Sequence, residues 1–396
     1  MKRPSDSTDT STPTVRLLLN CVDGTIPFLT PYLLKKYVVP SDDFFIGVAV
    51  RDSCVVAQYK HDKTTNAKNN KPSGYTFGFK GLDSHLMDYN RVTVPSFDLL
   101  QDAVDNDSIG VSANNDSVQV WTPQGRHTLP CSLYNKIARE LKSQVIVPCY
   151  DMALLSESKK RRENASRRCD AWLNEFVKDH DPSDGATFWA PIVLGLKRED
   201  RELPVSSSLG GIVFIGKSSG VDLFSELQSH LRNVRPTETI VLLSARSTLD
   251  FIEAVRAGVN VVGTALPQEW AKKKRAFVVP FVALSRSVPK RARVSEHGDD
   301  RATDVLDFNM DGCVDMNDSK FSRDALPLIP GCACLACSNS HSRAYIHHLV
   351  QAKELLAEIL LFAHNLHALR EMCRALSTDM DSTYVSIKTS IAKSSQ

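Results

Sequence analysis

Short apolar runs rich in β-branched residues recur along the first two thirds of the chain and predict strands. They lie at 15–20, 45–50, 145–148, 188–195, 211–216, 239–244 and 259–263. Helical patterns occur between many of them, at 133–141, 157–177, 221–231 and 248–257. Continuous apolar strands that alternate with helices are typical of a parallel sheet covered on both faces. The number of units favours a closed (β/α)8 barrel over an open sheet.

Helical periodicity is strongest near the C-terminus, where residues 344–376 predict one continuous helix. Its apolar residues follow the spacing of one helical face. They are Leu349, Ala352, Leu356, Ile359, Leu360 and Ala363. We expect this face to pack on the barrel. Residues 285–324 interrupt the pattern because they are charged and poor in apolar residues, and they include the basic run 290–293. We interpret them as a variable insertion.

Composition narrows the class of protein. Of the 396 residues, 42% are hydrophobic, which is enough for a large packed core. The formal net charge is only +2, so binding of nucleic acid would depend on local basic patches. The runs 159–162 and 167–168 form one such patch, which also fits a solvated helix face, and the run 272–275 forms another. Residues 1–14 predict a disordered tail and no signal peptide. No run approaches the roughly 20 apolar residues of a membrane helix, which predicts a soluble, cytoplasmic protein without a transmembrane segment.

The densest group of reactive side chains is a cysteine cluster. Cys332, Cys334 and Cys337 form a Cys-x-Cys-x2-Cys motif. A tight loop can present three thiolates to one zinc ion, whereas cysteines this close rarely reach disulfide geometry. In a chain without a secretion signal, such a cluster indicates a metal site.

A closed zinc site needs a fourth ligand, and a histidine is the expected type. The candidates that follow are His341, His347, His348, His364 and His367. Each of them taken alone is more often a packing or surface residue. Helical periodicity does not decide whether His364 or His367 is the ligand, and His347 and His348 are also possible ligands. A Cys3His set leaves no open coordination position, so the site is predicted to be structural.

Two further motifs suggest other ligands. Asp307-x-Asn309-x-Asp311-Gly312 followed by Asp318 partly matches a calcium loop, but the last ligand is not the usual bidentate Glu. The sequence at 211–218 matches the Gly-x4-Gly-Lys-Ser pattern of a phosphate-binding loop. However, its residues 212–215 predict a strand, and residues inside a sheet cannot bind phosphates. Nucleotide binding is therefore kept as an alternative only.

The C-terminal motifs resemble the zinc subdomain of the tRNA-guanine transglycosylases. The resemblance rests on the cysteine motif, the run Ser342-Arg343-Ala344-Tyr345-Ile346-His347-His348-Leu349, the pair His364-Asn365, and Phe321-x2-Asp324-x2-Pro327-Leu328. One extra residue lies between the cysteine motif and Ser342. A looser resemblance covers the barrel, through Gly210-Gly211 and residues 258–263 with Pro267.

This resemblance implies an irregular (β/α)8 TIM-type barrel with a C-terminal zinc-binding subdomain. It also implies one zinc ion per chain, bound by Cys332, Cys334, Cys337 and His364. In the family an aspartate attacks the ribose of a tRNA nucleotide, so that one base leaves and another enters. Four segments follow from these expectations: a tail at 1–14, a barrel at 15–284, an insertion at 285–324, and the zinc-binding subdomain with the C-terminal helices at 325–396.

The sequence departs from the family where that chemistry takes place. Gly263 aligns with the nucleophile and Asn260 with the preceding aspartate, and a glycine cannot form the covalent intermediate. The family's Asp-Ser-Gly-Gly motif is absent from the chain, and Lys217 or Ser218 stands at the glutamate that follows the glycine loop. Asp151 matches a base-recognition aspartate only ambiguously. The sequence therefore predicts no catalytic residue.

A family member that keeps its metal ligands and lacks its nucleophile resembles the non-catalytic subunits of the family. The resemblance implies a heterodimer with a catalytic queuine tRNA-ribosyltransferase subunit, in which guanine is exchanged for queuine at the wobble position of tRNA. The chain would then not be an enzyme on its own, and association with the mitochondrial outer surface is a further expectation. The alternatives are an active transglycosylase that uses a different carboxylate and a nucleotide-binding protein.

Overall fold

A computed structural model gives the structure of most of the chain. The residues that it describes are 14–21, 25–37, 44–50, 89–95, 113–122, 125–153, 157–196, 206–216, 220–232, 239–281, 306 and 308–393. The predicted tail, apart from Thr14, and the basic run 290–293 lie outside them. No helix in this part of the chain is both long and apolar enough to cross a membrane.

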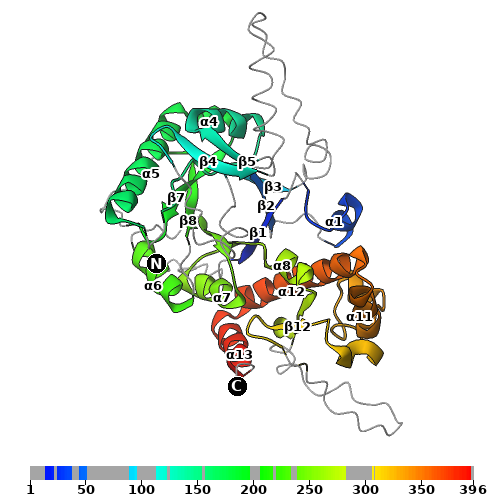
Figure 1. Ribbon diagram of the computed structural model, residues 1–396. Coiled ribbons are helices and arrows are strands. Elements are labelled where there is room, and N and C mark those ends of the chain that lie inside the picture. The colour runs from blue at the N-terminus through cyan, green and yellow to red at the C-terminus, as the bar shows by residue number, and fades with distance from the viewer. Residues whose placement is uncertain are drawn as a thin grey trace, which may run out of the picture.

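Eight parallel strands close into a barrel, which confirms the predicted fold class (Figure 1). Around the barrel the order is β1-β10-β9-β8-β7-β6-β3-β2. Their bounds are β1 Arg16–Asn20, β2 Phe44–Ala49, β3 Asn90–Val94, β6 Val145–Ile146, β7 Thr187–Val193, β8 Leu209–Ile215, β9 Thr239–Ala245 and β10 Val261–Thr264. Alternate side chains of these strands fill the interior, among them Leu18, Val92, Val213, Val241 and Val261.

Every apolar run predicted as a strand contributes to a barrel strand, but the sequence did not reveal β3. Polar residues interrupt its pattern. Arg91 is buried because its guanidinium donates to the carbonyl oxygen of Lys142 at 3.0 Å. Thr93 is buried because its hydroxyl pairs with that of Ser143 at 2.8 Å. These polar side chains can be buried because they form hydrogen bonds in the folded barrel. The sequence of β3 therefore lacks the continuous apolar run that identified the other barrel strands.

The barrel helices are α1 Pro31–Tyr37, α4 Cys131–Glu140, α5 Lys159–Asp179, α6 Gly220–Leu231, α7 Thr248–Ala257 and α8 Leu266–Lys272. The helices α4, α5, α6 and α7 start and end close to the predicted positions, whereas α1 and α8 were not predicted. Ser158 and Ser247 cap α5 and α7 by accepting backbone N–H bonds, and Gly258 ends α7 at a φ of 111°. The hairpin of β4 Ser117–Thr122 and β5 Gly125–Pro130 precedes α4, and η1 Pro182–Asp184 precedes β7.

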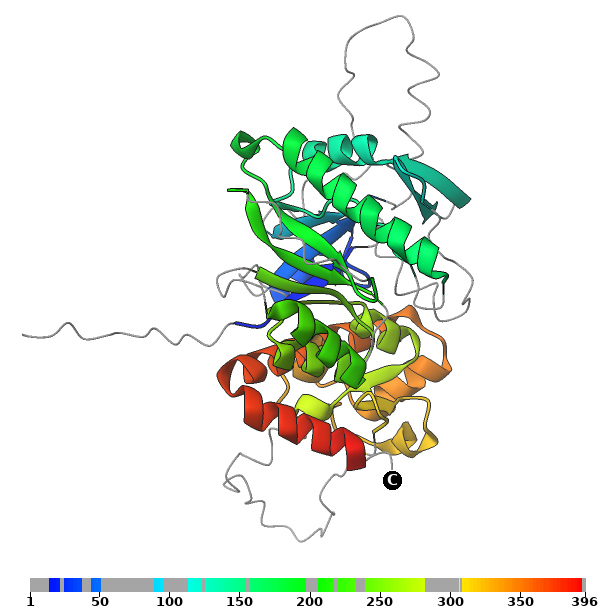
Figure 2. The same cartoon turned by 90° about the vertical axis from the view of Figure 1, so that its left-hand side faces the viewer.

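A second layer of short elements and long helices lies below the barrel (Figures 1 and 2). It contains β11 Arg275–Phe277, β12 Cys313–Asp315, η2 Ser319–Arg323, α10 Leu335–Ser338, α11 Arg343–Gln351, α12 Leu355–Thr378 and α13 Met380–Lys393. Within the predicted insertion, residues 308–324 are part of this layer, because β12 pairs with β11 and Cys313 and Phe321 are buried. The segment boundaries themselves stay predictions.

The prediction of one continuous helix over 344–376 was wrong. The chain turns between α11 and α12, where Lys353 has a left-handed φ of 58° and the N–H of Glu354 binds the carbonyl oxygen of Leu349. The predicted apolar face is divided as a result. Ala352 and Leu356 are exposed, whereas Leu360 and Ala363 are buried. Apolar spacing did not reveal this break because it continues across the turn.

Candidate metal centre and barrel mouth

The structure brings together three cysteines from one loop and a histidine from α12. The ligand atoms of Cys332, Cys334, Cys337 and His364 all lie within 4.8 Å of one another. His364 Nδ1 is 3.3 Å from Cys334 Sγ and 3.8 Å from each of the other two sulfur atoms. Sulfur and nitrogen ligands of one tetrahedral zinc ion are about 3.5 Å apart, so the four residues fit such an ion.

The loop is shaped to point its sulfur atoms inward. Gly331 has a φ of 80°, which favours glycine, and begins the turn. Cys334 then caps the short helix α10, because its Sγ accepts the backbone N–H of Cys337 at 3.3 Å. Cys332 and Cys334 are buried and Cys337 is half-buried. Burial away from water favours retention of a bound ion over exchange.

Neighbouring groups shift the pKa values of His364 and Cys337. Burial favours the neutral ring of His364, but Cys334 and Cys337 outweigh this effect and raise its pKa to about 10. Hydrogen bonds from Cys332 and Cys334 lower the pKa of Cys337. Both shifts favour the charged forms, a thiolate at Cys337 and an imidazolium at His364. A divalent cation would displace these protons, because the metal ligands are thiolate and neutral imidazole.

Neighbouring hydrogen bonds select the ligand nitrogen of His364. Its Nε2 donates to the carbonyl oxygen of Phe277 at 3.1 Å, which leaves Nδ1 to face the sulfur atoms. The next residue, Asn365, accepts the N–H of Phe277 at 2.8 Å and donates to the carbonyl oxygen of Arg275 at 3.0 Å. The His-Asn pair thus connects the metal centre to β11, which follows β10 and α8 in the chain.

The other candidate histidines have different surroundings. His347 Nδ1 lies 2.9 Å from the carbonyl oxygen of Met316, and His348 is exposed. His341 stacks on Tyr345, and the ring of His367 stacks on that of Phe281. Within the described part of the chain, the three thiols together with His364 are the one cluster suited to a metal ion.

An ion pair that sequence reasoning missed supports the same subdomain. Arg343 is only 1% exposed, and its Nη1 is 3.0 Å from Asp324 Oδ2. Its Nη2 donates to the carbonyl oxygen of Leu328 at 3.1 Å. Both charged residues belong to the motifs quoted above, but their spacing along the chain gave no indication that they pair.

At the barrel mouth, Gly263 lies opposite a β-bulge. Register between β9 and β10 shifts between Val262 and Thr264, so that Leu243 and Ser244 together face this one glycine. A Cβ atom on Gly263 would lie 2.0 Å from the carbonyl oxygen of Leu243. Asn260 accepts the N–H of Ile240 at 3.0 Å and has a structural role. The backbone of this mouth therefore leaves no room for a side chain at 263.

Asp151 follows β6 at the same mouth, and it is completely buried. Arg161 donates to both of its carboxylate oxygens, at 2.7 and 2.8 Å, and Arg168 donates at 2.9 Å. Sequence reasoning placed both arginines on a solvated or RNA-binding face, whereas they point inward. A carboxylate with three charge-assisted hydrogen bonds is not available as a free base.

Other acids near the strand ends are also engaged. The carboxylate of Glu226 accepts the N–H of Gly195, after β7. Asp250 accepts the N–H of Arg246, after β9, at 3.3 Å. These bonds fix the turns that leave the barrel strands.

The structure does not support the two other ligand motifs. Residues 211–215 lie inside β8, hydrogen-bonded between β7 and β9, so they cannot form a phosphate-binding loop. Lys217 and Ser218 lie outside the described residues. Of the calcium motif, Asp307 lies outside them too, Asn309 Oδ1 accepts the N–H groups of Asp311 and Cys313, and Asp318 caps η2.

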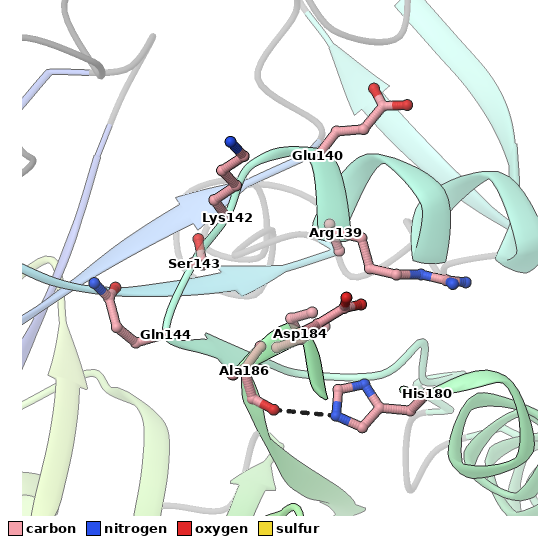
Figure 3. Close-up of a pocket in the computed structure, with 11 residues that line it drawn as sticks. Arg139, Glu140, Lys142, Ser143, Gln144, His180, Asp184 and Ala186 are labelled. Atoms are coloured by element: carbon pink, nitrogen blue, oxygen red, sulfur yellow. Dashed lines mark hydrogen bonds between the residues drawn. The ribbon is translucent and has the colours of Figure 1, made fainter. Parts of the chain in front are cut away.

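A pocket of about 470 Å³ lies at the opposite end of the barrel from the mouth, beside the loops that precede β6 and β7. Figure 3 shows Arg139, Asp184 and His180 meeting there from three different elements. His180 Nε2 donates to the carbonyl oxygen of Ala186 at 3.1 Å. Two cationic and two acidic side chains line the pocket, which gives it no clear preference for the charge of a ligand.

Comparison with known proteins places these features in a family. The family described as queuine tRNA-ribosyltransferase matches residues 80–385. A protein of Anopheles gambiae named queuine tRNA-ribosyltransferase accessory subunit 2 is 26% identical over 281 residues, which cover 66% of this chain and 60% of that relative. Relatives with the same name in Trichoplax adhaerens and Drosophila sechellia are 27% and 25% identical and cover 67% and 88% of this chain.

The extent of these matches differs. The match spans 82% of the Drosophila sechellia relative, but less than two thirds of the mosquito and Trichoplax relatives, at 60% and 66%. The matched region includes most barrel strands and all four clustered residues that could bind a metal ion. The chain belongs to the queuine tRNA-ribosyltransferase family.

Proposed function

We propose that this chain is the non-catalytic subunit of a heterodimeric queuine tRNA-ribosyltransferase, which exchanges guanine for queuine at the wobble position of tRNA. The observation that carries the proposal is the space around Gly263. Base exchange needs a nucleophile at the barrel mouth, and the bulge of β9 occupies the position of a side chain there. The names of the relatives as accessory subunits support the same role.

The alternative of an active enzyme with a different carboxylate has little support. Asp151 is the buried acid that follows β6, and Arg161 and Arg168 neutralise it. Releasing it would separate two ion pairs inside the fold, which is costly. Turnover by this chain alone would require that rearrangement.

For the metal, we propose one structural zinc ion at Cys332, Cys334, Cys337 and His364. Three thiolates and one imidazole are preferred zinc ligands, and the set leaves no position for a water molecule. The ion would join the cysteine loop to α12, and His364 and Asn365 would join α12 to β11. Its role is to hold the C-terminal subdomain against the barrel.

The C-terminal subdomain also offers a surface for the catalytic partner. Five large apolar side chains are exposed on it. Four lie on the segments around α11 and at the start of α12, namely Leu326, Tyr345, Leu355 and Leu356, at 45, 38, 64 and 39%, and the fifth, Val385, lies apart from them on α13. Exposed apolar side chains that gather on one subdomain are typical of a protein interface. Homologous barrels pair through equivalent surfaces, so the same subdomain of the catalytic subunit is the expected counterpart.

The test is co-purification with a catalytic subunit followed by a base-exchange assay. We expect the two chains to elute together and to incorporate labelled queuine into tRNA, and this chain alone to incorporate none. The double variant Leu355→Glu/Leu356→Glu should abolish co-elution. Val385→Glu, at a residue that is 58% exposed on α13, is the matched control and should leave pairing intact. Incorporation by this chain alone would refute the proposal.

A further inference from the structure

Helix α5 is an exposed helix that begins at the barrel mouth. Its buried residues Ala165, Trp172, Leu173 and Phe176 pack on the barrel. Figure 2 shows the helix lying along the outside of the barrel, with its outer face not covered by another helix or strand of the described chain. The C-terminal subdomain lies on the other side of the barrel (Figure 1). Pairing through that subdomain would therefore leave α5 open to another molecule.

The charge at the start of α5 opposes the helix dipole. Four consecutive cations at 159–162 open the helix, and its first turn contains no acid. The N-terminal end of a helix carries partial positive charge, so acids stabilise it and cations do not. Arg161 is compensated because it turns inward to Asp151. The outward cations oppose the dipole in the free chain and would favour a bound anion.

We define the α5 basic face as Lys159, Lys160 and Arg167, which are all exposed. Lys159 is 86% exposed at its side chain, and its contact with Glu163 is long, at 3.7 Å. Lys160 has no acid within ion-pair distance in the described part of the chain. A neutral partner, Asn164, accepts from Arg167 at 3.2 Å. The positive charge of this face is thus largely uncompensated.

We propose that the α5 basic face binds the phosphate backbone of RNA. The proposal rests on the proposed function for its partner, tRNA, but it assigns a surface outside the barrel mouth and the metal centre. An RNA backbone fits better than a membrane, because a helix that binds lipid inserts apolar side chains. The apolar side chains of α5 are already buried against the barrel, and Asn164 and Asn174 on its outer side are polar.

The experiment measures salt dependence with the full chain alone. Binding of a fluorescently labelled tRNA transcript is followed by anisotropy over a series of KCl concentrations. The slope of log K against log salt is negative, and each lost phosphate contact reduces its magnitude by about 1. The variant Lys159→Gln/Lys160→Gln/Arg167→Gln should therefore reduce this magnitude by about 2 to 3. The matched control is Lys353→Gln/Arg374→Gln/Lys393→Gln, which removes three exposed charges from the turn between α11 and α12, from α12 and from α13, and should leave the slope unchanged.

Three results would overturn the proposal. One is an unchanged slope in the α5 variant, and another is an equal loss in the control, which would indicate a net-charge effect. The third is binding to phosphatidylserine vesicles that depends on these residues while tRNA binding does not. Failure to pair with a catalytic subunit would remove the proposed function, yet an α5-dependent slope in the isolated chain would still support RNA binding.

Discussion

Placing a side chain at Gly263 should destabilise the barrel and should not restore catalysis. In the structure, a Cβ atom there would lie 2.0 Å from the carbonyl oxygen and 2.7 Å from the carbonyl carbon of Leu243. Real Cβ atoms essentially never come within 3.0 Å of heavy atoms outside their own residue and its chain neighbours. Strands β9 and β10 would therefore have to separate by about 1 Å at the bulge. The obstacle is backbone, so no change of rotamer relieves it.

We expect Gly263→Ala to lower the free energy of unfolding by about 3 kcal/mol, at the upper end of the usual cost of overpacking. Urea denaturation followed by circular dichroism measures this value. Gly210→Ala in β8 is the matched control, because the atoms nearest to its Cβ would belong to the side chain of Thr187, at 3.1 Å and beyond. Gly263→Asp should be at least as unstable as Gly263→Ala and should have no base-exchange activity. Wild-type stability of Gly263→Ala, or turnover by Gly263→Asp, would refute the reasoning.

Three further predictions concern the metal centre, Asp151 and the C-terminal helix. His364→Ala should lower bound zinc from one ion per chain to well below one by elemental analysis, whereas undiminished zinc would place the ion elsewhere. Arg161→Ala should lower the free energy of unfolding in urea by about 3 kcal/mol, because Asp151 stays buried with one cation fewer. Arg162→Ala should lower it much less, and equal losses in the two variants would contradict the ion-pair explanation. Burial by itself raises the pKa of Glu253, but hydrogen bonds from Lys388 and Tyr384 of α13 outweigh burial and lower it. The ionised Glu253 therefore stabilises the fold fully above pH 4.5, and this stabilisation is lost as the pH falls through the lowered pKa. The stability difference between wild type and Glu253→Gln should therefore shrink in acid, and a difference that grew instead would contradict this assignment.

Features that depend on neighbours along the chain were accessible from the sequence. Seven of the eight barrel strands are continuous apolar runs, so local composition predicted them; it did not predict β3 or the short strands β4, β5, β11 and β12 outside the barrel. Three cysteines within six positions are held together by the loop itself, whatever the rest of the fold does. The absence of a side chain at Gly263 is also a property of the sequence alone.

Features that depend on distant segments were decided only by tertiary structure. Helical spacing did not separate His364 from His367, and the family resemblance alone indicated His364; its position beside the cysteines depends on how α12 packs against β11. Arg161 and Arg168 have the same residue type as exposed arginines, and only a buried acid ten or more positions away turns them inward. The bulge of β9 that excludes a side chain at 263 arises from strand register. Periodicity and composition are local, whereas ion pairs, register and steric exclusion depend on which segments the closed barrel brings into contact.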